Sequence, residues 1–362
     1  MRRRFTLSAL AVTLAVLPSS TVLAQQGRAV VPGTGTLIDY ASDDFEQGDW
    51  GFVHHHPKSS REQDERLRGP TGKSTNRRWI EGPERGQPDL IKVVPTPPGG
   101  LAGSSQALML RTLHSGIPGY NSRDVQQDDI VFDTIKRLRG TIPVGEMPSF
   151  TVRVYLPPAD EWENRSGPHF GIRGSCQTIT DKVDSAGRGF WARATSSKEV
   201  EPYWPGMWIH FRSEGSRGNK ADSAFLTVRG DRRGRDFRAK EIPVDQFGWW
   251  TFGMSFTGDG SVHYYAKPGT DELTAADHIT SQYPYGFNAL RFRTYFFNVC
   301  NNNNGKSWST PFVIDDPKLY VKNSSRVERI VQQQEARDAR MAKAQEQREQ
   351  RAAQKRQMKK RG

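Results

Sequence analysis

Apolar and polar residues alternate with a period of two along several stretches of the chain, and this pattern constrains the fold more than any other feature. The alternation is clearest over residues 150–156, 207–212 and 290–297. Successive side chains of a β-strand point to opposite faces. Each stretch therefore predicts a strand with one face in a core and the other free for water or a ligand.

The order of these stretches favours one fold class. Residues 252–256 and 262–266 alternate on either side of Thr257-Gly258-Asp259-Gly260, which predicts a β-hairpin. No repeating strand–helix–strand rhythm is present, so a parallel doubly wound sheet is disfavoured. The 34 Gly and 22 Pro residues argue against a helical bundle. We therefore predict an all-β fold built as a two-sheet antiparallel sandwich.

The first 24 residues have the pattern of a secretory signal peptide. Three arginines at positions 2–4 precede an apolar stretch over residues 5–17, and residues 22–24 read Val-Leu-Ala. The apolar stretch is too short to span a bilayer, and the small residue at its end is typical of a cleavage site. We expect a secreted protein, located in the periplasm, outside the cell or on its surface. No later segment predicts a transmembrane helix.

The rest of the chain divides by composition into a linker at 25–38, a sandwich domain at 39–322 and a tail at 323–362. Within the domain, residues 54–103 are polar and rich in Arg, Gly and Pro, which predicts a long loop. The tail lacks Gly and Pro until its last residue and shows no sustained heptads. It predicts a solvated helix or a partly disordered arm.

The positive charge of the chain lies at its two ends. Of the net charge of +12, +7 follows Ser325 and +3 belongs to the signal peptide. A nearly neutral middle argues against a specific nucleic-acid-binding domain. The basic tail is expected to bind an anionic polymer or surface through long-range attraction.

The chain has two cysteines, Cys176 and Cys300. Export to an oxidising compartment would allow them to form a disulfide, and strand phase allows both to face one core. Two buried thiols acting as small apolar side chains are the alternative. Two cysteines are too few for a zinc ribbon or a disulfide-scaffold fold.

Two segments at the ends of the predicted domain carry a family resemblance. Residues 43–50 read Asp-Asp-Phe-Glu-Gln-Gly-Asp-Trp, and residues 312–321 read Phe-Val-Ile-Asp-Asp-Pro-Lys-Leu-Tyr-Val. They resemble the first and last strands of concanavalin A-like lectin and glucanase jelly rolls. The resemblance implies a jelly-roll sandwich whose terminal strands lie side by side. It also implies a curved concave sheet, which in that superfamily often binds or cleaves polysaccharides.

The acidic residues in these segments suggest one metal site. Many such jelly rolls hold a structural calcium near the paired ends, and Asp44 and Asp315 are the candidate ligands. The alternative is that these carboxylates close turns by accepting backbone hydrogen bonds. The run at His54, His55 and His56 is better explained as loop surface, because adjacent side chains point in opposite directions. No cofactor is required by any motif.

The carboxylate pair of the resembling glucanases is not found. Those enzymes place acid and nucleophile on one strand in the motif Glu-x-Asp-x-x-Glu. The nearest match is Glu161 with Glu163, which follows two prolines and predicts a loop. Glycoside hydrolysis by that mechanism is disfavoured.

Arginine and aromatic residues on the non-core phase of the predicted strands offer a better site. If these strands share the concave sheet, the groove is cationic and aromatic, and its ligand is an acidic polysaccharide. The alternative is an ordinary solvent-facing sheet surface. The candidate ligand-binding residues are Trp208, Arg212, Arg291 and Arg293, and the neighbouring candidates are Arg111, His210 and Tyr295.

The last three residues also resemble the site of alginate-lyase-like jelly rolls. That family orders an Arg-rich strand, a strand with Gln-x-His and a strand with Tyr-Phe. The resemblance implies that His210 is the base, Tyr295 the acid and Arg111 the group that neutralises the uronate carboxylate. The sequence departs from the family at Trp208, where Gln is usual, and at Phe297, where Lys is usual.

Three hypotheses follow for the function. The first is a secreted protein that binds an acidic polysaccharide through its concave sheet. The second is a polysaccharide lyase that cleaves a uronate polymer by β-elimination. The third is a structural protein of the cell surface or matrix, held to anionic polymer by its tail.

Overall fold

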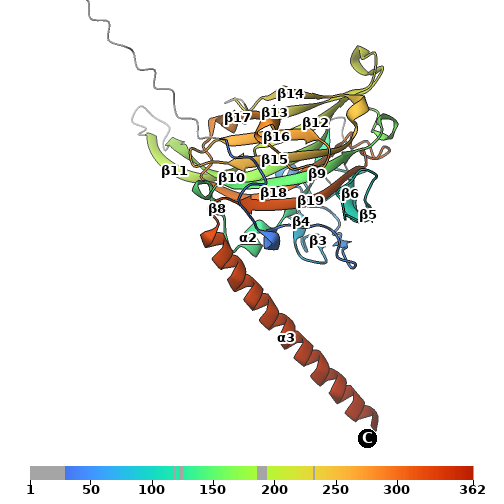
Figure 1. Ribbon diagram of the computed structural model, residues 1–362, viewed down its shortest axis with the longest axis vertical. Coiled ribbons are helices and arrows are strands. Elements are labelled where there is room, and N and C mark those ends of the chain that lie inside the picture. The colour runs from blue at the N-terminus through green and yellow to red at the C-terminus, as the bar shows by residue number, and fades with distance from the viewer. Residues whose placement is uncertain (1–28, 118–119, 122–124, 186–193, 231–232, 362) are drawn as a thin grey trace, which may run out of the picture.

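The computed structural model describes residues 29–117, 120–121, 125–185, 194–230 and 233–361. Over these residues the chain forms two antiparallel β-sheets that pack face to face, with one long helix at the C-terminal end (Figure 1). The predicted all-β sandwich is therefore confirmed. The predicted signal peptide lies outside the described residues.

The described residues form one sheet of eight strands and one of eleven. The first has the order β17 (His278–Gln282), β16 (Val262–Pro268), β15 (Gly248–Phe256), β9 (Pro148–Leu156), β19 (Phe312–Val321), β6 (Gln106–Arg111), β5 (Leu90–Pro95), with β1 (Thr36–Leu37) also on β19. The second has the order β14 (Asp236–Ile242), β13 (Ser223–Arg229), β12 (Gly206–Arg212), β10 (Gly167–Ser185), β18 (Arg291–Asn301), β7 (Gln126–Phe132), β4 (Trp79–Glu81), β3 (Lys73–Ser74), β2 (Phe52–Val53), with β11 (Ala194–Tyr203) on β10 and β8 (Ile142–Pro143) on β18.

The core lies between the two sheets and is built from the apolar phase of their strands. From β9, β15 and β12 the inward residues are those that the alternation predicts. They are Phe150, Val152, Val154, Leu156, Phe252, Met254, Phe256, Met207, Ile209 and Phe211, each at most 2% exposed. The predicted hairpin is β15–β16, with Phe256 paired to Val262.

A β-bulge in β18 changes the facing of that strand. Ser175 of β10 pairs with Thr294, but the next residue, Cys176, pairs with Phe292, so Arg293 is an extra residue. An extra residue shifts the alternation by one. Phe292 points into the core before the bulge, and Tyr295 points into the core after it. The prediction that Tyr295 lies on the outer face with Arg293 is therefore wrong.

Residues 54–103 are more ordered than a loop. They contain a short helix, α1 (Arg61–Asp64), and the strands β3, β4 and β5, which extend both sheets. The predicted linker also packs on the sandwich, since Val30 is 6% and Ile38 3% exposed and β1 begins at Thr36. Short strands of two to six residues carry too little alternation to be visible in the sequence.

The predicted pairing of the chain ends is present with one change. The closing segment is β19, as predicted, and it pairs with β1 through Thr36 and Val321. The opening segment at 43–50 is not a strand. It forms turns beside β19, where Asp43 N donates to Pro317 O at 3.1 Å and Phe45 is fully buried.

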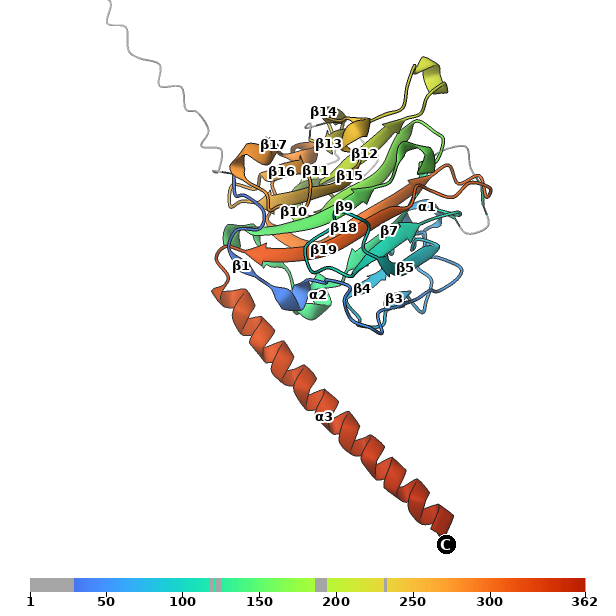
Figure 2. The ribbon, with the colours of Figure 1, turned by 45° about the vertical axis from the view of Figure 1, so that its right-hand side comes forward.

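The tail is the helix α3 (Ser325–Arg361), which confirms the helical alternative (Figure 2). Its first turns pack on the sandwich: Val327 is 1% exposed, and Arg326 forms a 2.5 Å ion pair with Glu146. Tyr40 Oη donates to Asp338 at 2.7 Å. Beyond this contact the helix projects away from the body. Among the described residues no helix is both long and apolar enough to cross a bilayer.

This arrangement predicts different effects for two truncations. Removing residues 342–362 is expected to leave the melting temperature unchanged, because residues 342–354 and 356–358 are exposed. Removing residues 326–362 should lower the free energy of unfolding by about 1.5–3 kcal/mol, because it exposes the site filled by Val327. Denaturant titration of the two proteins measures the difference. Equal stability of both would contradict the packing of the first turns.

The two cysteines are free and buried, so the disulfide prediction is wrong. Cys176 lies opposite Phe292, whereas Cys300 is eight residues further along β18. That spacing is roughly 25 Å, and a disulfide needs Cα atoms about 4–7 Å apart. The bulge also separates them. Cys176 points into the core cluster, whereas Cys300 follows the inward-facing Val299 and points to the other face of the sheet.

Burial predicts that neither thiol reacts in the folded protein. It raises the pKa of Cys300 to about 12 and raises that of Cys176 still further. A thiol reagent should therefore label neither cysteine in buffer and both in denaturant without reductant. Labelling that requires a reductant would show that the cysteines are oxidised in the isolated protein.

Candidate ligand-binding groove

A groove of about 610 Å³ lies on the outer face of the eleven-stranded sheet. Six strands contribute to it, namely β4, β7, β10, β11, β13 and β18, together with neighbouring segments. Its floor is formed by the side chains of β10 and β18 that point away from the core. The residues used below are Arg61, Glu62, Glu84, Arg85, Asp129, Asp133, Arg173, Trp204, Arg229, Tyr285, Arg293 and Phe296.

Arg173 occupies the floor of the groove. It follows Ile172, which points into the core, so alternation along β10 turns Arg173 outward. The side chain is only 3% exposed, and its Nη2 donates to Trp204 O at 2.9 Å. Its Nε is buried and has no hydrogen-bond partner among the described residues. Burial, and then the nearby Arg85, lower the pKa of Arg173 to about 10, so the guanidinium stays charged at neutral pH.

Aromatic rings hold this guanidinium in place. Its carbon lies 5.0 Å from the ring of Trp208 and 5.1 Å from that of Phe296. Trp208 is itself between two cations, since the guanidinium of Arg229 lies 4.9 Å from the same ring. Cation–π attraction stabilises such pairs. Trp208 is 5% exposed and therefore supports the floor rather than offering a free ring.

Arg229 is fixed by neighbours on two sides. Its Nε and Nη2 donate to Asp236 at 2.6 and 3.2 Å, and its Nη1 donates to the hydroxyl of Tyr285 at 2.6 Å. Burial acts to lower the pKa of Arg229, but the hydrogen bonds to Asp236 and Tyr285 outweigh it and raise the pKa. The Tyr285 ring is thereby held at the wall of the groove, where it is half-buried.

Two carboxylates at the edge of the groove form ion pairs, and a third caps a helix. Arg85 contacts Glu62 at 2.5 Å, and Arg61 contacts Glu84 at 3.0 Å. Asp133 caps the helix α2 (Thr134–Arg137) by accepting from Lys136 N.

Asp129 lies deeper, 3.8 Å from Arg85, and accepts from Asn298 Nδ2. Burial raises its pKa, and Arg85 and Arg173 oppose that shift.

Arg173 and Arg293 are the cations of the groove without an ion pair in the described part of the chain. Arg293 is the bulge residue of β18 and is half-buried. The bulge turns its side chain into the groove while Phe292 and Tyr295 both stay in the core. The groove therefore presents two guanidinium groups that make no direct ion pair among the described residues, beside half-buried rings at Trp204 and Tyr285.

The structure brings together only some of the predicted ligand-binding residues. Trp208 and Arg293 belong to the groove or its support. Arg212 shares the face of Trp208 but lies outside the groove, 4.5 Å from the ring of Phe225 and 4.0 Å from Glu241. Arg291 is exposed before the bulge and donates to Thr141 Oγ1.

The three predicted catalytic residues do not share one site. Arg111 is on β6 of the other sheet, where its Nε donates to Ser309 O at 3.1 Å. Tyr295 is fully buried in the core, and its hydroxyl donates to Ala41 O at 3.2 Å. His210 stacks on Phe225, and burial lowers its pKa to about 4. The prediction that they converge on one groove is wrong, because two of them point away from it.

The candidate metal ligands have other roles. Asp44 is exposed, and its Oδ1 accepts from Glu46 N at 3.1 Å, which is the turn-closing alternative. Asp315 is 1% exposed, and burial raises its pKa to about 6. In the residues that the structure describes, no three or more His, Cys, Asp or Glu side chains gather in a metal-binding group. A structural calcium at Asp44 and Asp315 stays a prediction.

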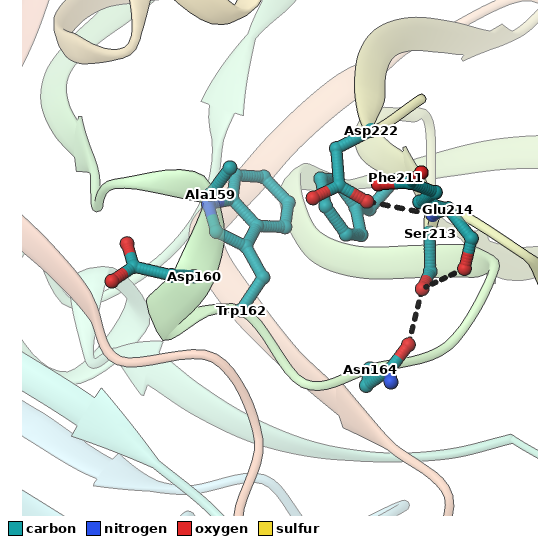
Figure 3. Close-up of a pocket in the computed structure, with 8 residues that line it drawn as sticks. All are labelled: Ala159, Asp160, Trp162, Asn164, Phe211, Ser213, Glu214 and Asp222. Atoms are coloured by element: carbon teal, nitrogen blue, oxygen red, sulfur yellow. Dashed lines mark hydrogen bonds between the residues drawn. The ribbon is translucent and has the colours of Figure 1, made fainter. Parts of the chain in front are cut away.

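A second hollow of about 380 Å³ lies between the ends of β9 and β12 (Figure 3). The rings of Trp162 and Phe211 stack at 4.6 Å beneath it. Its polar lining includes Ser213, whose hydroxyl contacts Asn164, and Asp222, which accepts from Glu214 N at 2.7 Å. The nearby Glu163 pairs with Arg165 at 2.6 Å, while Glu161 is exposed. Glu161 and Glu163 both lie between β9 and β10 and outside any strand, as the preceding prolines predict.

Arg173, Arg229, Asp129 and Tyr285 were not predicted from the sequence. Arg173 could have been found, because Phe170 and Ile172 fix the inward phase of β10 and leave Arg173 on the outer face. Arg229, Asp129 and Tyr285 come from strands and loops far apart in the chain, and only the order of the strands brings them to one groove.

Comparisons with known proteins give similarity of fold. No protein-family model matches the sequence, and no curated protein matches it. A carbohydrate esterase from Shiga toxin-encoding bacteriophage phi24B is similar at 11% identity and a TM-score of 0.38, over 75% of this chain and 99% of that one.

Two lyases are similar in structure with lower TM-scores. An alginate lyase from Klebsiella pneumoniae shares 8% identity over 61% of this chain and 81% of its own, with a TM-score of 0.29. A glucuronan lyase from Trichoderma reesei shares 12% over 64% and 90%, with a TM-score of 0.28. Likeness at these identities concerns the arrangement of strands and not the chemistry of a site.

Proposed function

We propose that this is a secreted protein that binds an acidic polysaccharide in the groove on the eleven-stranded sheet. The observation that carries the proposal is Arg173, a guanidinium that is 3% exposed, lies at the floor of the groove and has an unpartnered Nε. Arg173 interacts with the Asp129 carboxyl at a distance but makes no direct ion pair among the described residues, and a buried cation without a direct partner is costly. A ligand carboxylate or sulfate would supply the missing partner in the form that guanidinium binds best.

The rest of the groove supports the same class of ligand. Arg293 adds a second cation without an ion pair among the described residues, and Trp204 and Tyr285 offer half-buried rings that could stack on sugar faces. Secretion rests on the signal-peptide pattern of residues 1–24. An open groove lined by six strands suits a polymer better than a small molecule.

The test is a glycan array with neutral, carboxylated and sulfated polymers, followed by titration of each ligand found. We expect binding to acidic polymers that weakens with salt, because the charges at the edge of the groove are screened. Binding confined to neutral glycans would overturn the proposal. The same samples are followed by absorbance of the unsaturated product, whose formation would assign the protein to the lyases.

The end of α3 provides a second, weaker contact with anionic polymer. Residues 350–361 contain six Lys or Arg and no carboxylate. Removing residues 342–362 should reduce adsorption to a polyanion matrix at low salt and leave binding in the groove unchanged. Column retention of the two proteins at two salt concentrations measures this. Unchanged retention would exclude the tail as an attachment.

A further inference from the structure

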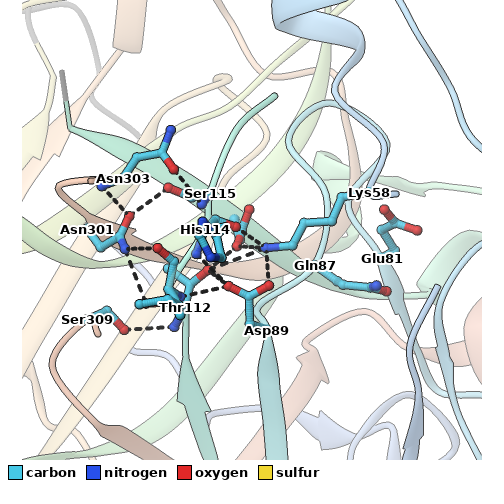
Figure 4. A network of polar contacts seen from close by, with 12 residues as sticks. Lys58, Glu81, Gln87, Asp89, Thr112, His114, Ser115, Asn301, Asn303 and Ser309 are labelled. Carbon is cyan, nitrogen blue, oxygen red and sulfur yellow. Dashed lines mark hydrogen bonds and ion pairs between the residues drawn. The ribbon is translucent and has the colours of Figure 1, made fainter. Parts of the chain in front are cut away.

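A cluster of one buried lysine, one buried aspartate and one half-buried aspartate lies where the two sheets meet at one end of the sandwich; Figure 4 labels Lys58 and Asp89. Lys58 follows β2 and is 4% exposed, Asp89 precedes β5, and Asp128 is in β7 and is fully buried. Lys58 Nζ lies 2.6 Å from Asp128 Oδ2 and 2.8 Å from Asp89 Oδ1. The cluster lies apart from the groove, since Asp128 points inward with Ile130 while Asp129 points outward.

The two carboxyl groups have different surroundings. Asp89 Oδ2 accepts from the backbone N–H groups of Leu113 and His114, both at 2.7 Å. Burial acts to raise the pKa of Asp89, but Lys58 and these hydrogen bonds outweigh it and lower the pKa, so Asp89 is ionised.

Burial raises the pKa of Asp128 to about 8, with Lys58 opposing, so at neutral pH this carboxyl is mainly protonated. Its Oδ1 has no hydrogen-bond partner in the described part of the chain.

Lys58, Asp89 and Asp128 together provide the groups that amide formation requires. A protonated carboxyl is a better electrophile than a carboxylate, and a neutral amine is the nucleophile. Asp89 is placed to accept a proton from the Lys58 ammonium. The Lys58 nitrogen is already held against Asp128 by Asp89, by the His114 carbonyl and by Thr112 Oγ1 at 3.5 Å. Because the fold already holds the two groups together, the reaction does not have to meet the entropy cost of bringing two reactants together.

We propose that Lys58 and Asp128 join in an intramolecular isopeptide bond. Lys58 gives a proton to Asp89, and its neutral Nζ attacks the Asp128 carboxyl carbon. The C–N bond forms as the C–OH bond breaks, and the hydroxyl leaves as water with the proton that Asp89 returns. Asp89 then takes the second proton from the new amide nitrogen and ends protonated. The sum is loss of one water, with no oxidant, reductant or further reactant.

The bond would tie the segment before α1 to β7. That segment leads into Arg61 and Glu62 at the edge of the groove. A covalent link closes a long loop of chain and reduces the entropy of the unfolded state. A secreted protein with no disulfide between its two cysteines would thus gain a cross-link that reductants do not cleave.

The test compares intact masses of the unaltered protein and Lys58→Arg, both denatured. Arg keeps the positive charge beside the two aspartates but cannot form this amide. We expect the unaltered protein to be lighter than Lys58→Arg by the Lys-to-Arg difference plus one water. A digest should contain one branched peptide that joins Lys58 to the Asp128 segment. Separate linear peptides and a mass without loss of water would overturn the proposal and leave an ion pair.

Asp89→Asn separates proton transfer from position. This variant keeps both residues of the bond and removes the group that accepts the proton. If it folds, we expect the water loss to be incomplete or slow after purification. Complete water loss in Asp89→Asn would overturn the role of Asp89. Because the measurement on the unaltered protein needs no variant to fold, the bond itself is tested in either case.

Discussion

Replacing Arg173 with alanine is expected to weaken binding of an acidic glycan by tenfold or more. A hydrogen bond to a charged group contributes about 1.5–3 kcal/mol, which corresponds to roughly 10- to 150-fold in the dissociation constant. The expected effect is towards the upper part of this range, because Arg173 is 3% exposed and its charge is poorly screened. Titration calorimetry at two salt concentrations measures the loss and its salt dependence.

Arg212→Ala is the matched control for this experiment. Arg212 shares the outer face of the same sheet and also contacts an aromatic ring, but it lies outside the groove. It should change affinity by less than a factor of about three, because its half-buried charge lies outside the groove and faces Glu241. Melting temperatures of both variants show whether the fold persists. Equal losses of affinity would mean that the ligand follows the whole face and not the groove.

The alternation of apolar residues predicted most of the fold, because burial acts on each strand locally. Residues of β9, β12 and β15 face the core as their phase requires, since a one-residue slip would expose every apolar side chain of the strand. The alternation did not predict which side chains of β18 face the core, because the bulge in this strand depends on its pairing with β10. Nothing in residues 291–297 alone marks Arg293 as the extra residue.

The site was less predictable than the fold, for a physical reason. Trp208 and Arg293 were found because strand phase indicates which residues leave the core. Phase does not say which sheet a strand joins, so Arg111 was placed with His210 although the two lie on different sheets. It also does not distinguish a ring that meets a ligand from one that supports a cation, which is the role of Trp208.

Tyr295 provides the largest expected effect on stability. Tyr295→Ala should lower the free energy of unfolding by about 3–5 kcal/mol, as for other large-to-small changes of a buried aromatic residue. Its ring stacks on Phe132 at 4.9 Å and on Phe150 at 5.1 Å, so the cavity would open between the two sheets. Phe292→Ala should have a similar effect, because the bulge places both residues in the core. Denaturant unfolding of the two variants measures this.

Tyr295→Phe distinguishes a core residue from a catalytic acid. It keeps the ring and removes only the hydroxyl that donates to Ala41 O, a hydrogen bond that contributes about 1 kcal/mol. We expect a small loss of stability, unchanged glycan affinity and, if the protein cleaves its ligand, unchanged cleavage. Loss of cleavage in Tyr295→Phe with the fold intact would require the hydroxyl to reach the substrate. That would need the two sheets to separate at their centre, where Trp79, Phe132 and Phe150 are now fully buried.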